Sequence, residues 1–199
     1  MLQISNLTYI LEGFPLINNL NLSTNNWIFF VFGPSGSGKT TLFKLIFWLL
    51  KPTLWEIKTS KNIWIFWQNY NLLPLDGKTN LNLPFYFHKL KKDKKREDKL
   101  IDYFEVNNIL SKNTENMSNW EKEKIWILKA FITKPNLVLL DETWNSLHQD
   151  LKIKLINFVK KYSKENTVLW ISHDYFITSN LKSEDIIYKW NFNIYRTKC

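Results

Sequence analysis

A glycine-rich stretch at residues 33–41, reading G-P-S-G-S-G-K-T-T, has the residue types and spacing that bind phosphate. It meets the pattern G-x-x-x-x-G-K-[ST] in full and follows an apolar run at residues 28–32, which predicts a buried strand. Glycines let the backbone turn tightly around an anion, and a helix beginning near Lys39 would direct the positive end of its dipole at the same point. Lys39 would then reach the β- and γ-phosphates, and the Thr40 hydroxyl would bind Mg²⁺. The predicted phosphate-binding residues are Gly33, Pro34, Ser35, Gly36, Ser37, Gly38, Lys39, Thr40 and Thr41.

Polar residues also follow two apolar runs that read as parallel strands. Asp141 and Glu142 come directly after residues 137–140, and His173 follows residues 168–171. Because ligands of an open parallel sheet lie beyond the carboxyl ends of its strands, these side chains are expected at one site. Asp141 fits a ligand of Mg²⁺, Glu142 a base for an attacking water, and His173 a contact to the γ-phosphate. The alternative for a histidine after a strand is a capped or packed side chain.

The segment before the glycine-rich loop is expected to cover the base of a nucleotide. Residues 2–22 predict antiparallel β-structure with a turn at Glu12 and Gly13. Tyr9 is the aromatic residue best placed to stack on the base. The alternative is that Tyr9, a residue type that favours strands, is packing alone.

The rest of the chain alternates apolar strands with amphipathic helices, which predicts an α/β fold. A strand at residues 63–66 leads to Gln68, and the helix after the loop is expected over residues 41–50, stopped by Pro52. The expected apolar face of that helix consists of Leu42, Leu45, Ile46 and Leu49. Helical periodicity and rising charge at residues 79–131 indicate a helical subdomain inserted into the sheet domain.

Composition restricts the class of protein. The 199 residues fit one α/β domain, and the one cysteine, Cys199, fits a reducing compartment. Neither a signal peptide nor an apolar run of the roughly 18 to 20 residues that span a membrane is evident. The net charge of +9 allows a nucleic-acid or anionic membrane partner. Because acidic residues interrupt the basic run at residues 89–99, a solvated helix face is the favoured interpretation.

The order of these motifs resembles the ATP-binding subunits of ABC transporters. The resemblance rests on the glycine-rich loop, Gln68, M-S-N-W-E at residues 117–121, L-L-D-E at residues 139–142 and S-H-D at residues 172–174. It extends over residues 2–195, which is nearly the whole chain.

The resemblance implies one ABC-type ATPase domain over residues 1–199. A P-loop NTPase core with a mainly parallel sheet and an N-terminal antiparallel β-subdomain would comprise residues 1–78 and 132–199. The helical signature subdomain would comprise residues 79–131. The implied cofactors are ATP and Mg²⁺.

The family further implies a head-to-tail dimer, either a homodimer or a heterodimer with a related ATPase subunit. Each ATP would lie between the loop of one subunit and the signature of the other, and closure would drive a separate integral membrane permease. Gln68 then matches the residue that senses Mg²⁺ and water, Glu142 the catalytic base and His173 the switch histidine. The signature residues that act in trans are Ser118, Asn119, Trp120 and Glu121, and the metal ligands are Thr40, Gln68 and Asp141. The protein would be cytoplasmic, peripheral on the inner face of the cell membrane, and without a nucleic-acid partner.

Some positions depart from the family pattern. Trp120 replaces the second glycine of L-S-G-G-Q or L-S-G-G-E, where an indole should block the approach of the partner's ATP. His148 replaces the aspartate of a dimer-contact loop, and the best alignment puts Leu11, not Tyr9, at the base-stacking position. The stretch Q-N-Y-N-L-L-P, followed by N-L-N-L-P, is similar to the branch that serves lipoprotein release, macrolide export and cell-division complexes.

The tryptophan content is unusual. The chain has ten tryptophans and five glycines, where about 14 glycines are expected at the average frequency of roughly 7%. Seven tryptophans lie at or next to positions where the family has a glycine or a small residue, and Trp190 among them is expected at a turn between the last two strands. These seven are Trp27, Trp48, Trp55, Trp64, Trp120, Trp126 and Trp190. The hypothesis is that many or all ten are glycines encoded by UGA and mistranslated as tryptophan.

Three alternatives remain open from the sequence. A soluble ABC-type ATPase that acts on nucleic acid or the ribosome is favoured only by the basic charge. A non-hydrolysing regulatory subunit, or a degenerate paralogue that tolerates aromatic residues, would explain Trp120 without any recoding.

Overall fold

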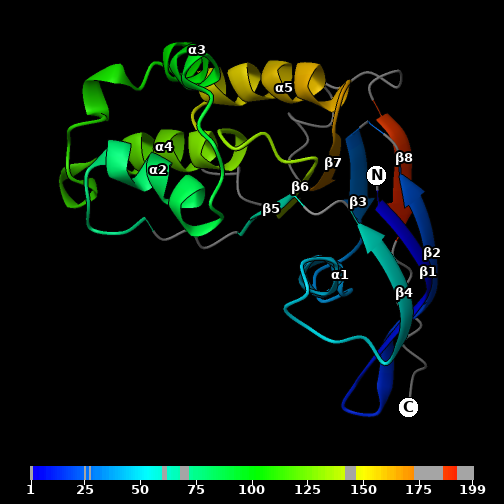
Figure 1. Cartoon of the computed structure of the whole chain (residues 1–199). Coiled ribbons are helices and arrows are strands. Elements are labelled where there is room, and N and C mark those ends of the chain that lie inside the picture. The colour runs from blue at the N-terminus through cyan, green and yellow to red at the C-terminus, as the bar shows by residue number, and fades with distance from the viewer. Residues whose placement is uncertain are drawn as a thin grey trace. The chain divides into compact units, whose positions relative to one another are not determined.

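The computed structural model describes residues 2–24, 26, 28–59, 62–67, 72–141, 147–172 and 186–191 (Figure 1). The chain divides into two compact units. The first comprises residues 1–68, 136–145 and 155–199, and the second comprises residues 69–135 and 146–154. The segment predicted as a helical subdomain, residues 79–131, falls inside the second unit.

A five-stranded sheet forms one layer of the first unit, with the strand order β5-β6-β7-β3-β8. All four neighbouring pairs in this sheet are parallel. Its strands are β3 (Ile28–Phe32), β5 (Ile63–Phe66), β6 (Leu137–Asp141), β7 (Thr167–Ile171) and β8 (Ile186–Asn191). Every residue of β6 and β7 is buried, as expected for strands covered on both faces. The predicted mainly parallel sheet is confirmed.

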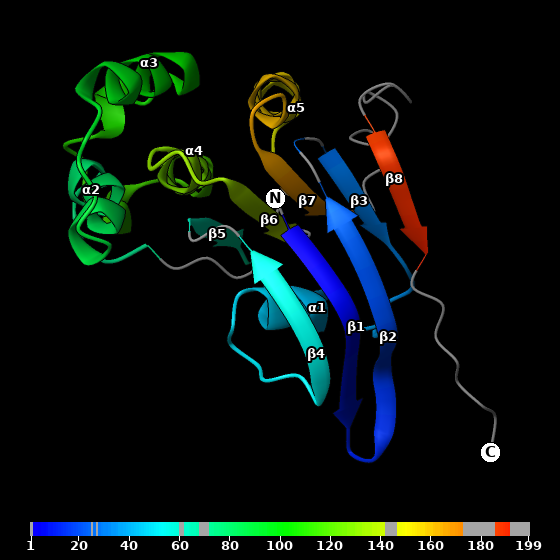
Figure 2. The ribbon, with the colours of Figure 1, turned by 45° about the vertical axis from the view of Figure 1, so that its right-hand side comes forward.

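A three-stranded antiparallel sheet, in the order β2-β1-β4, forms the second layer of this unit (Figure 2). Its strands are β1 (Leu2–Leu11), β2 (Phe14–Thr24) and β4 (Leu54–Thr59). The predicted turn is present, with Glu12 at a φ of 51° and Gly13 at 83°. The antiparallel N-terminal β-structure is therefore confirmed, and β4 adds a third strand.

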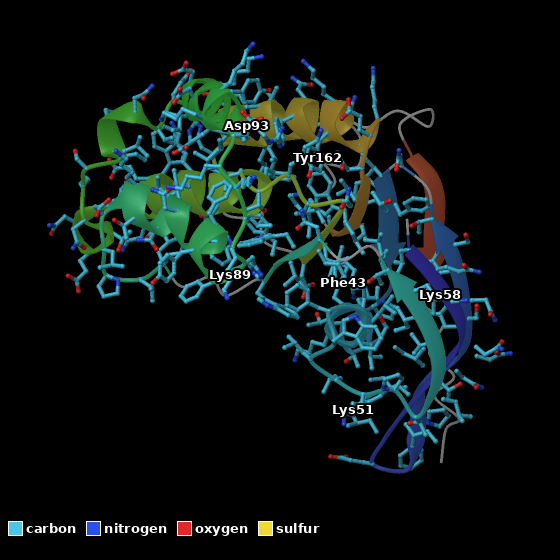
Figure 3. All side chains as sticks on the ribbon, viewed as in Figure 1. Phe43, Lys51, Lys58, Lys89, Asp93 and Tyr162 are labelled. Carbon is cyan, nitrogen blue, oxygen red and sulfur yellow. The ribbon has the colours of Figure 1, made fainter. Side chains whose placement is uncertain are left out.

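Helix α1 (Lys39–Ile46) shares one hydrophobic core with both sheets and contacts β6. Figure 3 labels Phe43, which is fully buried in this core, and Lys51 and Lys58, which are exposed. The helix is shorter than the predicted range of 41–50. Leu42, Leu45 and Ile46 are buried as expected, but Leu49 lies beyond the helix and is 57% exposed. The helix ends in a left-handed turn well before Pro52, so the proline does not stop it.

The second unit contains three helices of the segment predicted to be helical. They are α2 (Gly77–Phe87), α3 (Lys94–Phe104) and α4 (Asn119–Phe131), and the short 3-10 turns η1 (Asn107–Ile109) and η2 (Thr114–Asn116) lie between α3 and α4. The side chains of Asp76, Asp93 and Ser118 cap the three helices. Helix α5 (Gln149–Ser163) begins in this unit and continues in the first. Within the described ranges, no helix is long and apolar enough to cross a membrane.

One sequence prediction about the end of the chain is wrong. The family pattern placed Trp190 in a turn, but the structure has it inside β8, paired with Val31 of β3.

Candidate functional site

The glycine-rich loop joins the carboxyl end of β3 to the first residue of α1. Two of its glycines adopt left-handed backbone angles, Gly36 at a φ of 77° and Gly38 at 93°. A Cβ atom on Gly38 would also lie 3.2 Å from Cγ of Leu16. Ser37 N donates a hydrogen bond to Pro34 O at 3.2 Å and so closes the turn. Glycine is therefore required at position 38 both by backbone conformation and by space.

Lys39 is the buried cation of the loop, with 5% of its surface exposed. Its Nζ donates to Gly33 O at 2.8 Å and to Pro34 O at 3.0 Å. Neutral carbonyls are weaker partners for an ammonium than phosphate oxygens, so these bonds can be exchanged when a phosphate enters. Ser37 Oγ is buried within the same loop and has no hydrogen-bond partner among the residues that the structure describes. An orphaned hydroxyl, a buried ammonium and an open helix N-terminus together fit an anionic phosphate group.

A hydrogen bond between Thr40 and Asp141 links α1 to β6 at the carboxyl ends of the parallel strands. Thr40 Oγ donates to Asp141 Oδ1 at 3.3 Å, and Asp141 is 3% exposed. A hydroxyl oxygen and a carboxylate oxygen at this separation are the hard ligands that Mg²⁺ prefers, with phosphate oxygens and water completing its shell. The residues present therefore fit a magnesium nucleotide.

The structure describes only some of the other predicted site residues. Gln68, Glu142 and His173 lie outside the described residues, and their roles stay predictions. Pro34, Ser35 and Gly36 are exposed on the loop, while Thr41 is half-buried. Tyr9 is partly buried against the hydrophobic core and pairs with Ile17 across the antiparallel sheet.

Ser118, the serine of the predicted signature, begins helix α4 as its N-cap in a complete capping box. Ser118 N donates to Glu121 Oε2 at 2.7 Å, and Ser118 Oγ donates to the same oxygen at 3.0 Å. In return, Glu121 N donates to Ser118 Oγ at 3.3 Å. The serine is exposed, so its hydroxyl is held at the surface of the second unit in a defined orientation.

Lys112 is a participant that sequence reasoning missed. Its Nζ donates to Glu121 Oε1 at 3.2 Å and to Oε2 at 2.9 Å. This hydrogen bond is the largest cause that holds the pKa of Glu121 below its ordinary value, followed by the bond from the Ser118 amide. The S-x-x-E spacing signals the capping box, but nothing local in the sequence signals a lysine nine residues away.

Trp120 lies in the first turn of α4 and is 45% exposed. Lys124 Nζ lies 3.8 Å from the centroid of its ring, a cation–π contact. Burial lowers the pKa of Lys124. The large indole therefore projects at the surface beside Ser118, at the position where the family has a glycine.

Comparison with known proteins gives a consistent result. A family model described as "ABC transporter" matches residues 17–145. The zinc import ATP-binding protein ZnuC of Wolbachia pipientis is 29% identical, over 98% of this chain and 81% of its own length. The probable iron export ATP-binding protein FetA of Escherichia coli is 30% identical, over 87% of this chain and 85% of its own length.

Solved structures resemble the fold. One described as the ATP-binding subunit of an ABC transporter superposes with a TM-score of 0.82 at 19% identity, over 90% of this chain and 82% of its own. Another, a dimeric ATP-binding cassette in a post-hydrolysis state with ADP and Pi bound, gives a TM-score of 0.75 at 23% identity, over 89% and 90%.

Proposed function

The chain belongs to the ABC transporter family, and on that premise we propose that it is the ATP-hydrolysing subunit of a transporter whose membrane permease is a separate chain. The observation that carries the proposal is the geometry of the loop. Buried Lys39 lies beside an open helix N-terminus, and the Thr40 hydroxyl is hydrogen-bonded to the Asp141 carboxylate. Those groups supply a cation for phosphate and oxygen ligands for Mg²⁺ at one edge of a parallel sheet.

Each residue of the predicted ATP site has a separate role in this function. Lys39 would exchange its bonds to the loop carbonyls for bonds to the β- and γ-phosphates, and Thr40, Asp141 and Gln68 would hold Mg²⁺. Glu142 orients or deprotonates the attacking water, because it follows the strand that carries Asp141. His173 would contact the γ-phosphate. Tyr9 packs against the hydrophobic core, which favours its alternative role in packing over a stack on the base.

The site is completed by a second ATPase subunit. Ser118 to Glu121 of one subunit would close on the ATP held by the other, so that binding closes the dimer and hydrolysis reopens it. The exposed position of Ser118 at a helix N-terminus supports this role, because its hydroxyl and the helix dipole both favour an anion. The protein would then lie at the inner face of the cell membrane, bound to its permease.

We further propose that many of the ten tryptophans are glycines in the native protein. Replacing all ten would give fifteen glycines, close to the average frequency of about 7%. The strongest support is Trp48, which has a φ of 63° directly after the C-cap of α1. Its N–H donates to Leu45 O at 3.1 Å, and Leu49 N donates to Lys44 O at 2.8 Å, which is the Schellman pattern. Glycine is the usual residue at this left-handed position.

Trp120 and Trp170 give opposite indications about this recoding. A glycine at position 120 would remove the indole beside Ser118 and let the backbone approach the partner's ATP. Trp170, in contrast, is fully buried and stacks on Phe30 with ring centroids 5.5 Å apart. A glycine there would leave a cavity unless neighbouring side chains repack, so position 170 has the weakest support.

Within the family, we propose the branch that serves lipoprotein release, macrolide export or cell division, on the motifs Q-N-Y-N-L-L-P and N-L-N-L-P. The relatives named above carry the labels zinc import and iron export, so neither cargo nor direction follows from them. An adjacent permease gene of that branch would support the assignment, and an adjacent metal-importer permease would refute it.

Two experiments test the function and the recoding separately. The chain with glycine at every tryptophan position except 170 should hydrolyse ATP with Mg²⁺, and Glu142→Gln in that chain should bind ATP and dimerise without turnover. Intact ATP binding without hydrolysis in the glycine form would refute the catalytic assignment. The codons at the ten positions decide the recoding, since UGG at these sites excludes it.

A further inference from the structure

Lys112 contacts the signature but has no role in the function proposed above. We propose that Lys112 is a positioning residue of the trans site, which holds Glu121 on Ser118 and neutralises the Glu121 carboxylate where the partner's γ-phosphate approaches. This inference rests on the proposed function, because it gives the lysine a task only if the signature closes on ATP.

The backbone of Lys112 is anchored before the signature begins. Lys112 O accepts a hydrogen bond from Gly77 N at 3.1 Å, and Lys112 N donates to Ile109 O at 3.1 Å. The ammonium therefore extends from a fixed point between η1 and η2. The Lys112 side chain is 39% exposed and that of Glu121 is 19% exposed, so the pair is partly shielded from solvent.

Three donors converge on one oxygen, Oε2 of Glu121. They are the Ser118 amide at 2.7 Å, the Lys112 ammonium at 2.9 Å and the Ser118 hydroxyl at 3.0 Å. The hydroxyl has a single proton, so it must leave this oxygen to donate to a phosphate. When it does, Oε2 keeps two donors, one of them charged, and the carboxylate is not left unsatisfied.

Lys112 also compensates the negative charge of Glu121. Glu121 is ionised, as its lowered pKa indicates, and an unpaired carboxylate beside an incoming triphosphate would repel it. The ammonium cancels that charge while leaving the capping box in place. A glutamine at position 121 carries no charge and would need no ammonium beside it. Lys112 is therefore expected to matter only while position 121 is a glutamate.

The test compares Lys112→Met, Glu121→Gln and the double variant in the full chain carrying glycine at position 120, with exposed Lys78→Met as the control. Lys112→Met should raise the ATP concentration needed for dimerisation and the KM for ATP about fivefold to tenfold, with a smaller effect on kcat. The Glu121 carboxyl, followed by NMR in the monomer, should titrate at a higher pH in Lys112→Met. In the Glu121→Gln chain the same lysine substitution should have no effect.

Each result supports or overturns the inference. An equal ATP dependence with and without Lys112 would overturn it, as would the same loss in the Glu121→Gln chain, which would indicate a purely structural role. If the form with Lys112 binds ATP yet never dimerises, the trans site itself is refuted and the inference fails with it. If the dimer forms with ATP and Lys112→Met leaves the ATP dependence unchanged, the inference about Lys112 is refuted while the proposed function is supported.

Discussion

The end of helix α1 allows a direct test of whether the backbone at position 48 requires glycine. Trp48 has a φ of 63° and is half-exposed, and its N–H and that of Leu49 close the helix on carbonyls of the last turn. Comparing Trp48→Gly with Trp48→Ala isolates the backbone, because both variants lose the whole indole. We expect the glycine variant to be the more stable of the two.

The size of this difference follows from two opposing effects. A left-handed conformation costs an alanine about 1–2 kcal/mol, and glycine adopts it without that cost. The greater freedom of glycine in the unfolded chain offsets about 0.5–1 kcal/mol. The central estimate for the net advantage of glycine is therefore about 0.75 kcal/mol, which corresponds to about 1.5–3 °C in Tm for a chain of this size.

The assay is urea and thermal unfolding of both variants, with Lys44 as the matched control. Lys44 is exposed on the same helix in a right-handed conformation, where glycine should be about 1 kcal/mol less stable than alanine. The order of the two substitutions should thus reverse between positions 44 and 48. Equal or greater stability of Trp48→Ala would refute the argument from backbone angle.

Three further outcomes are expected. Lys39→Met should weaken ATP binding at least tenfold, because a charge-assisted contact is lost; unchanged affinity for a fluorescent ATP analogue would contradict the assigned site. Trp170→Ala should lower the free energy of unfolding by about 3–5 kcal/mol, since it empties a buried site stacked on Phe30, and a loss below about 1 kcal/mol in urea titrations would show that the packing is loose. Asp76 and Glu121 have lowered pKa values, so the caps of α2 and α4 should contribute stability above about pH 4.5 and lose it as pH falls through the lowered values. Circular dichroism should show that acid loss of helix, and Asp76→Asn combined with Glu121→Gln should flatten the profile.

Sequence reasoning predicted those elements whose signals are local. The run of apolar residues in β6 and the turn at Glu12 and Gly13 each need only a few adjacent residues to be recognised. The end of α1 was predicted wrongly because Leu49 continued the apolar period and Pro52 offered a stop. The actual boundary is a left-handed residue, and tryptophan is not a residue type that predicts one.

The same distinction between local and long-range signals applies to the residues of the site. The phosphate loop was predictable because a single stretch supplies its glycines, its lysine and its threonine. The partnership of Lys112 with Glu121 was not, because η2 and the start of α4 lie between them and only folding brings them within 2.9 Å. The pairing of Trp190 with Val31 likewise depends on which strand lies beside β3, a choice made by the whole sheet.

The position of β3 in the parallel sheet has a consequence for biosynthesis. The ribosome makes this strand before both of its neighbours, because β7 begins at Thr167 and β8 at Ile186. Until they emerge, β3 has no partners within its own sheet, and its exposed edges are available for aggregation. The phosphate loop that follows β3 therefore lacks its supporting sheet until β7 and β8 have been made, so nucleotide binding is acquired with those strands and not when the loop itself leaves the ribosome.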